Sequence, residues 1–425
     1  MSSATGDAGL RALWENDTVK IGATLLAFYV AYLALGTLLG YPIRGQINSL
    51  ARLTFLIGVY AMLSLALNLH WGYTGIFNIG IAGFMAVAVY VMAIFTKPVV
   101  AQAGSYQLSG LGLPMVVGVL AGMVAAALVG FVVALPALRL RADYFAIVTI
   151  ASSEIIRFIL LSKTFQSIKF GSMTLGTGGG RGILFSNPLG FLYDMGWFKG
   201  LTDVFAPIIG SNPSAVVASL VYAAVLLVFV GGFYWLMRRT GQSPFGRVLK
   251  AIREDEDVAN ALGKNTSSFK IKSFMLGCAL IGLAGIFWVG SRGQVSPNVF
   301  KPKITFYVWI ALIIGGSGSN TGSVMGATLF VGLLFQGPLY IKDILTSVLD
   351  FGPAPNTIAQ AFGPLGGGNV MPFLSYTLNN IEPLKIVLLG VILIWLVQNR
   401  PDGLLGHRKE IASSIDVDEH RGDGR

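Results

Sequence analysis

The residues best suited to chemistry in this sequence are charged groups set inside apolar stretches. Glu154 and Arg157 lie three positions apart in one apolar run, so a helix places them on one face. If that run crosses a membrane, each charge near its middle costs roughly 2.5–3.5 kcal/mol by insertion scales, and such residues therefore pair or serve a function. We expect a mutual ion pair turned into the protein; the alternative is contact with a zwitterionic substrate or with a gate.

Two glycine-rich segments interrupt apolar surroundings with polar side chains. Residues 71–84 read WGYTGIFNIGIAGF, and residues 315–322 read GGSGSNTG. Non-helical backbone at membrane depth is tolerated only where it is buried in protein or lines a cavity. Each segment is therefore either a tight turn between helices or a broken helix beside a translocation path, and their correspondence suggests an internal repeat. The candidate path residues are Asn78, Gly80, Glu154, Arg157, Gly315, Gly316, Gly318 and Ser319.

Residues 246–265, GRVLKAIREDEDVANALGKN, form the most informative polar segment. Their apolar residues recur at helical spacing over 246–263, which predicts an amphipathic helix too short to cross a membrane. A helix lying on lipid head groups is one interpretation, but such helices favour a basic polar face, and this one is mixed. We favour a helix that docks on a cytoplasmic partner. Its candidate docking residues are Arg253, Glu254, Asp255, Glu256, Asp257, Ala259, Leu262 and the helix-ending Gly263.

The sequence lacks the motifs of several enzyme and cofactor classes. Gly263-Lys264 is followed by Asn265, and Val258 stands where a phosphate-binding loop needs its first glycine. One cysteine and three histidines exclude a thiolate metal cluster and an HExxH-type zinc site. We therefore expect no cofactor, no metal and no enzyme activity, so that any ATP must be hydrolysed by a partner.

Composition indicates which elements must position these residues. Hydrophobic residues make up 54% of the 425 residues and charged residues 12%, whereas a soluble domain carries about 25% charged residues. Mean hydropathy is +0.70. A membrane-spanning helix needs roughly 20 mostly apolar residues, which predicts an all-α polytopic bundle of about ten spans, within a range of 8 to 11. The apolar runs lie near 21–40, 53–69, 81–95, 113–136, 144–161, 214–237, 273–290, 304–317, 323–341 and 383–397.

Basic residues predict the orientation of this bundle. Eight Lys or Arg residues lie between 238 and 272, and such a cluster belongs in the cytoplasm. Counting spans in both directions then places the N- and C-termini in the cytoplasm and two long connections, 162–213 and 342–381, outside, where we expect short helices or irregular structure. The net charge of +10 fits a basic cytoplasmic face and not a nucleic-acid partner. Residues 1–410 would be one transmembrane domain and 411–425 a polar cytoplasmic tail.

Five segments carry a joint family pattern and span most of the chain: 67–84, 138–157, 246–263, 311–327 and 400–406. Together they resemble the M-type permease subunit of branched-chain amino acid ABC importers. The family implies a second, H-type permease, two cytoplasmic ABC ATPase subunits and an extracytoplasmic substrate-binding protein, all at a cell (plasma or inner) membrane that this chain crosses several times. It also implies that 246–263 is the coupling helix and that the substrate is Leu, Ile or Val, although related permeases import urea, short amides or other amino acids.

Two other functional classes compete with an ABC permease. A stand-alone secondary transporter or channel would carry its own coupling carboxylates deep in several spans, and apart from Glu154 the predicted spans are nearly free of them. A membrane enzyme would need a cluster of titratable groups in a cavity. The sequence therefore favours a subunit of a primary active importer.

Overall fold

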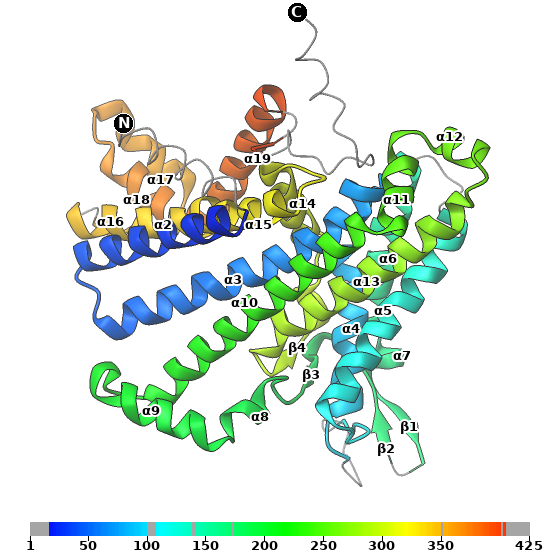
Figure 1. Ribbon diagram of the computed structural model, residues 1–425. Helices are drawn as coiled ribbons and strands as arrows, with labels where there is room; N and C mark the ends of the chain where they lie inside the picture. Colours follow the sequence, from blue (N-terminus) through cyan, green and yellow to red (C-terminus); the bar gives the residue numbers. More distant parts are fainter. Residues whose placement is uncertain are drawn as a thin grey trace, which may run out of the picture.

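The computed structural model describes residues 17–99, 108–137, 142–171, 173–349, 352–400 and 403–404, and these form a bundle of helices (Figure 1). Apolar runs long enough to cross a lipid core have folded as helices, because helices satisfy their own backbone hydrogen bonds in lipid. The long helices are α2 (Asp17–Leu38), α3 (Ile43–Asn68), α5 (Met115–Ala137), α6 (Ala142–Leu161), α10 (Pro213–Gln242), α13 (Thr266–Gly290) and α19 (Ile381–Asn399).

Shorter helices complete the bundle. The apolar helix α15 continues through a π-helix into α16, so that the three together form one long element. The shorter elements are α4 (Ile81–Thr96), α14 (Lys303–Gly315), α15 (Asn320–Leu329), η4 (Phe330–Gln336) and α16 (Gly337–Val348).

The core lies around α3 and α13. Their most apolar stretches are 83% and 78% buried, whereas those of α2, α5 and α6 are 22% buried or less. α3 packs against α10, α13, α14 and α15, and α4 packs between α5 and α13. The outer helices expose large apolar side chains such as Val116, Leu120 and Val124 on α5, as expected for surfaces that face lipid or another subunit.

The described residues hold fewer membrane-length helices than the ten predicted spans, and the count of seven or eight lies at or just below the lower end of the predicted range of 8 to 11. Within the described residues, seven helices are long and apolar enough to cross a membrane, with α15, η4 and α16 together counted as one. The count is eight if α18 (Met371–Asn379) and α19, which meet at 85°, form one broken span. All ten predicted segments are helical, but α4 has 16 residues and α14 has 13, or roughly 24 and 20 Å against a 30 Å core. α4 begins just after Gly80 and α14 ends at Gly315, so each borders a glycine-rich segment in which the chain is buried non-helical backbone.

The two ends of the bundle carry different short elements. One end carries α11 (Pro244–Glu254) and α12 (Glu256–Ala261), and we call it the α11–α12 end; α8 and α9 lie at the other side of the molecule (Figure 1). The predicted connection 162–213 contains α7 (Lys163–Gln166), β1 (Ile168–Phe170), β2 (Met173–Leu175), η2 (Gly179–Arg181), β3 (Ile183–Leu184), α8 (Gly190–Tyr193) and α9 (Gly196–Ile209).

Two small sheets in this region were not part of the all-α prediction. β1 pairs antiparallel with β2, with Ile168 opposite Leu175, and β3 pairs with β4 (Gln294–Val295), which is followed by η3 (Pro297–Val299). The predicted connection 342–381 contains the end of α16, α17 (Ile358–Phe362), η5 (Gly363–Gly367) and α18. Both connections therefore hold short helices, as expected, and the predicted tail 411–425 lies outside the described residues.

Candidate functional site

The two glycine-rich segments, far apart in the sequence, meet at the α11–α12 end. α3 runs into a π-helix, η1 (Leu69–Tyr73), and the Asn68 side chain accepts a hydrogen bond from the backbone N–H of Gly318 (2.7 Å). The Asn68 amide donates to Oδ1 of Asn320 (3.1 Å), and the Asn320 amide donates to the Tyr73 hydroxyl (2.7 Å). We call Asn68, Tyr73, Gly318 and Asn320 the Asn68 cluster. Its buried polar groups bond one another, so the cluster fastens the two segments together.

Glycine allows the second segment to turn within a small space. A Cβ atom at Gly315 would lie 1.9 Å from the backbone oxygen of Gly322, and Gly318 has φ +90°, which favours glycine. Ser319 caps α15 by accepting from the Gly322 N–H (3.0 Å). The backbones of α14 and α15 can therefore pack closely, as small residues permit in membrane helices.

Asn78 and Gly80 lie in the connection between η1 and α4. The Asn78 side chain accepts from the Gly80 N–H (2.8 Å), and its backbone oxygen accepts from the Trp309 indole of α14 (2.9 Å). A Cβ atom at Gly80 would lie 2.6 Å from the backbone oxygen of Thr149 in α6. This geometry is that of a tight, buried connection, and a role in the translocation path stays a prediction for these residues.

Glu154 and Arg157 form the expected ion pair on α6. Arg157 Nε donates to both carboxylate oxygens at 3.0 Å and Nη2 donates to Oε2 at 2.5 Å. The Arg157 and Glu154 side chains are only 13% and 27% exposed, and the guanidinium carbon lies 4.5 Å from the centre of the Phe158 ring. α6 packs against α4 and α5, so the pair is separate from the Asn68 cluster. Each charge is satisfied by the other.

The polar loop after α10 contains two helices where the sequence predicted one helix over 246–263. α11 ends at Glu254, and Asp255 has an extended backbone that caps the next helix. The Asp255 carboxylate accepts from the backbone N–H groups of Asp257 (2.9 Å) and Val258 (3.0 Å). An aspartate with this geometry begins a new helix, which explains the break. Gly263, with φ +77°, follows the end of α12 as predicted.

The apolar residues of this loop are divided between two surfaces. Leu249, Ile252 and Ala259 are buried against the chain itself, whereas Leu262 is 74% exposed and Val258 is 54% exposed. The apolar residues that recur at helical spacing in this loop are therefore not all exposed. Only the exposed ones on and just after α12 are available to another protein.

α11 contacts the first glycine-rich segment directly. Arg253 donates to the backbone oxygen of Gly72 and pairs with Glu254, while the buried Lys250 places its ammonium 5.3 Å from the centre of the Tyr73 ring. α12 is held in turn by an ion pair between Glu256 and Lys270 of α13. The docking loop and the Asn68 cluster thus form one contiguous set of contacts.

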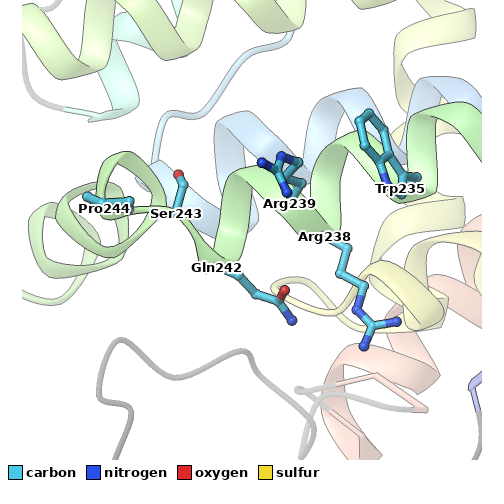
Figure 2. A pocket seen from close by; sticks show the side chains of 6 residues that line it. All are labelled: Trp235, Arg238, Arg239, Gln242, Ser243 and Pro244. Atoms are coloured by element: carbon cyan, nitrogen blue, oxygen red, sulfur yellow. The ribbon is translucent and has the colours of Figure 1, made fainter.

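A basic surface cavity of about 520 Å³ lies beside this loop, where α10 leads into α11. Figure 2 shows the side chains of Arg238 and Gln242 extending to the same side of α10. Within the described residues, neither Arg238 nor Arg239 forms an ion pair. Exposed arginines flanked by Trp235 are typical of the border between lipid and water.

Sequence reasoning identified the loop and both glycine-rich segments but missed the residues that join them. Asn68, Tyr73 and Asn320 were not among the candidates, although Asn68 is fully buried and Asn320 nearly so. Amides in otherwise apolar surroundings were the available signal, because a buried amide requires partners.

Comparison with known proteins matches residues 49–351 to the family of permease components of branched-chain amino acid transport systems. The chain belongs to this family. It is 32% identical to the LivM permease protein of Salmonella typhimurium over 75% of this chain and 68% of that protein, and 31% identical to LivM of Escherichia coli over 78% and 72%. A probable LivM of Methanocaldococcus jannaschii is 25% identical over 85% of this chain and 94% of its own length. No solved structure matches the chain significantly.

Family membership confirms the resemblance on which the sequence analysis relied. The matched range runs from α3 to α16 and includes the loop and both glycine-rich segments. Because the relatives are transport permeases and the chain has several membrane-length helices, it is a multi-pass protein of the inner membrane. The relatives are transport components and not enzymes.

Proposed function

We propose that the chain is the permease subunit of an ABC importer and forms half of a translocation path for branched-chain amino acids. The observation that carries the proposal is the family match over residues 49–351, because it covers both glycine-rich segments, the α6 ion pair and the α11–α12 loop. The relatives that match over most of this chain are named as permeases of high-affinity branched-chain amino acid transport. The other half of the path would come from an H-type permease.

The energy would come from two separate ATPase subunits, and an external binding protein would deliver the substrate. The α11–α12 end would face the cytoplasm, because the basic residues of the loop and of the adjoining end of α10 lie there. The exposed Leu262 and Val258 are the groups that can enter a groove on an ATPase. Glu254 and Asp257, also exposed, can meet basic residues at the rim of that groove.

The contacts of α11 supply a route for force. A displacement of the loop moves Arg253, which holds the Gly72 carbonyl, and Lys250, which lies over Tyr73. Tyr73 is bonded to Asn320 and thereby to Asn68 and the second glycine-rich segment. One movement of the loop would therefore reach both segments, which is what coupling between hydrolysis and a two-state path requires.

Replacement of Leu262 by Asp tests the docking role. Loss of an interface anchor commonly costs about 2 kcal/mol or more, or roughly 30-fold in affinity, and a charge in the groove adds to that cost. We expect normal membrane insertion, with ATPase subunits that no longer co-purify or with hydrolysis uncoupled from uptake. Ala259 is unsuitable for this test because it is buried in the chain itself.

Val204→Asp is the matched control, since Val204 is 69% exposed but lies on α9. Its assembly with the ATPases should equal that of the unchanged chain. Equal assembly and equal uptake for Leu262→Asp would refute the docking role.

Uptake by the complete importer tests the substrate. Proteoliposomes that contain both permeases and both ATPases, supplied with binding protein and ATP, should accumulate labelled leucine, isoleucine or valine. Accumulation of urea or acetamide in place of these amino acids would support the alternative substrates.

A further inference from the structure

A second cavity, of about 330 Å³, lies at the end of the bundle opposite the α11–α12 end. Its wall includes the residues before and within the first turns of α3, whereas the Asn68 cluster lies at the last residue of that 26-residue helix, roughly 40 Å long. α2, η4 and α16 supply the remaining wall. The residues that give the cavity its chemistry are Tyr32, Tyr41, Arg52, Gln336, Tyr340 and Asp343.

Two opposite charges face this cavity without pairing with each other. Among the described residues, Arg52 forms no ion pair, and Asp343 forms none either. One oxygen of the Asp343 carboxylate, Oδ2, accepts a hydrogen bond from the Tyr41 hydroxyl (2.8 Å). Burial and the Asp343 carboxylate raise the pKa of Tyr41 to about 12, so Tyr41 keeps its proton and remains a donor at neutral pH.

A buried amide also borders the cavity without a partner. Gln336 is 6% exposed, and its Nε2 has no hydrogen-bond partner. A buried donor left unsatisfied costs about 1–3 kcal/mol, so an acceptor that binds at this wall of the cavity would remove that cost. Gln336 is the last residue of the π-helix η4, and π-helical turns are frequent at functional sites.

Three tyrosine rings enclose the same space. The ring centres of Tyr32 and Tyr340 lie 4.6 Å apart in an edge-on arrangement, and those of Tyr41 and Tyr340 lie 6.4 Å apart. Tyr32 is fixed by a hydrogen bond from its hydroxyl to the backbone oxygen of Gly332 (2.7 Å). The faces of such rings attract an ammonium group.

We propose that this cavity binds a free α-amino acid as a zwitterion. Arg52 and the Gln336 amide hold the carboxylate, and Asp343 and the tyrosine rings hold the ammonium group. A volume near 330 Å³ lies at the small end of the range for ligand sites, about 300–1,000 Å³, as a single amino acid requires. The assignment rests on the proposed function and adds a substrate-binding site on the side that would face the binding protein.

A phosphatidylethanolamine head group carries the same two charges, so the experiment must separate it from a free amino acid. Ser49 also lines the cavity, and the single native cysteine, Cys278, is fully buried. A Ser49→Cys variant, assembled in the complete importer and held in nanodiscs, therefore gives this chain one accessible thiol, at the site, and labelling of this chain is measured. The measured quantity is the rate at which a small thiol reagent labels it.

We expect saturating leucine to slow this labelling by about tenfold, in line with mass action. Isocaproate, which lacks the ammonium group, and isoamylamine, which lacks the carboxylate, should each protect far less. Arg52→Gln or Asp343→Asn in the Ser49→Cys background should abolish protection by leucine. A Ser211→Cys control, at an exposed position in the same outer region, should be labelled at a rate that leucine does not change.

Three results would overturn the site. The first is absence of protection by leucine. The second is protection by isocaproate and by isoamylamine that equals the protection by leucine. The third is protection that depends on the phosphatidylethanolamine content of the nanodisc and not on leucine. Uptake by the unchanged importer is measured in parallel. Uptake of leucine without protection would reject the cavity while the proposed function stands, whereas absence of uptake of every branched-chain amino acid would reject the proposed function itself.

Discussion

Two pairs of opposite charges in this protein are arranged in opposite ways. On α6, Glu154 and Arg157 form three hydrogen bonds to each other. Arg52 of α3 and Asp343 of α16 line one cavity and form no ion pair among the described residues. A paired set neutralises itself and leaves nothing for a ligand, whereas an unpaired set keeps both charges available. The sequence predicted an ion pair for the first set, with contact to a substrate or gate as the alternative, and the structure confirms the ion pair. The second set is the one that we propose for the substrate.

The largest expected effect is on leucine binding, through the unpaired charges Arg52 and Asp343. Arg52→Gln and Asp343→Asn each remove a charged hydrogen-bonding group, worth about 1.5–3 kcal/mol, so leucine binding to the permease should weaken roughly 10- to 100-fold. The expression and melting temperature of both variants should stay unchanged, because neither residue supports an ion pair within the described chain. Binding of labelled leucine to purified importer measures the effect.

Matched controls for this first prediction exist at the same end of the bundle. Arg44 begins the same helix and bonds Ser211 (2.5 Å), and Asp203 is an exposed acid on α9. Arg44→Gln and Asp203→Asn should leave leucine binding unchanged. A loss of binding as large in the controls as in the cavity variants would remove the distinction between charges that line the cavity and charges elsewhere at this end.

The second-largest effect is expected on the stability of the folded protein, through the Glu154–Arg157 ion pair. Glu154→Gln or Arg157→Leu leaves one charge without its partner in a membrane helix, and we expect a loss of about 1–3 kcal/mol, seen as a lower yield of folded protein. The double variant should recover much of that yield. Fluorescence-detected chromatography in detergent gives the yields, and normal yields with abolished uptake would instead assign the α6 pair to the substrate or the gate.

The smallest expected effect on leucine binding comes from loss of the Tyr41 hydroxyl, which donates a hydrogen bond to Asp343. Tyr41→Phe removes the donor to Asp343 but keeps the ring, so we expect a loss of about 0.5–1.5 kcal/mol, or roughly two- to tenfold in leucine binding. A loss as large as that of Asp343→Asn would show that Tyr41 contacts the ligand itself. Thr346→Ser, a mild change at a nearby residue of α16, serves as the control.

Local features of the fold could be predicted because they depend on neighbours in the sequence. The apolar runs predicted the positions of all ten helical segments. The three-residue spacing predicted the Glu154–Arg157 pair, and Gly263 predicted where the loop helix ends. The break at Asp255 was missed although its signal was local. An aspartate followed by Glu256 and Asp257 in the next turn is a helix start.

The remaining features depend on distant contacts that periodicity does not encode. α4 begins after Gly80 and α14 ends before Gly316, where the backbone is not helical. Such backbone is tolerated only because other helices pack around it. The cavity brings Tyr32 next to Tyr340, although the two residues are far apart in the sequence. No pattern along the chain places those two residues together.

The Asn68 hydrogen bond also has a consequence for the order in which the protein is made. Asn68 and its partner Gly318 are 250 positions apart, so at about 5–20 residues per second a ribosome needs on the order of 10–50 s to supply the partner. During that interval the Asn68 side chain, which is fully buried in the folded protein, lacks its native partners Gly318 and Asn320. The packing of α3 at this end can therefore be completed only after the start of α15 has left the ribosome.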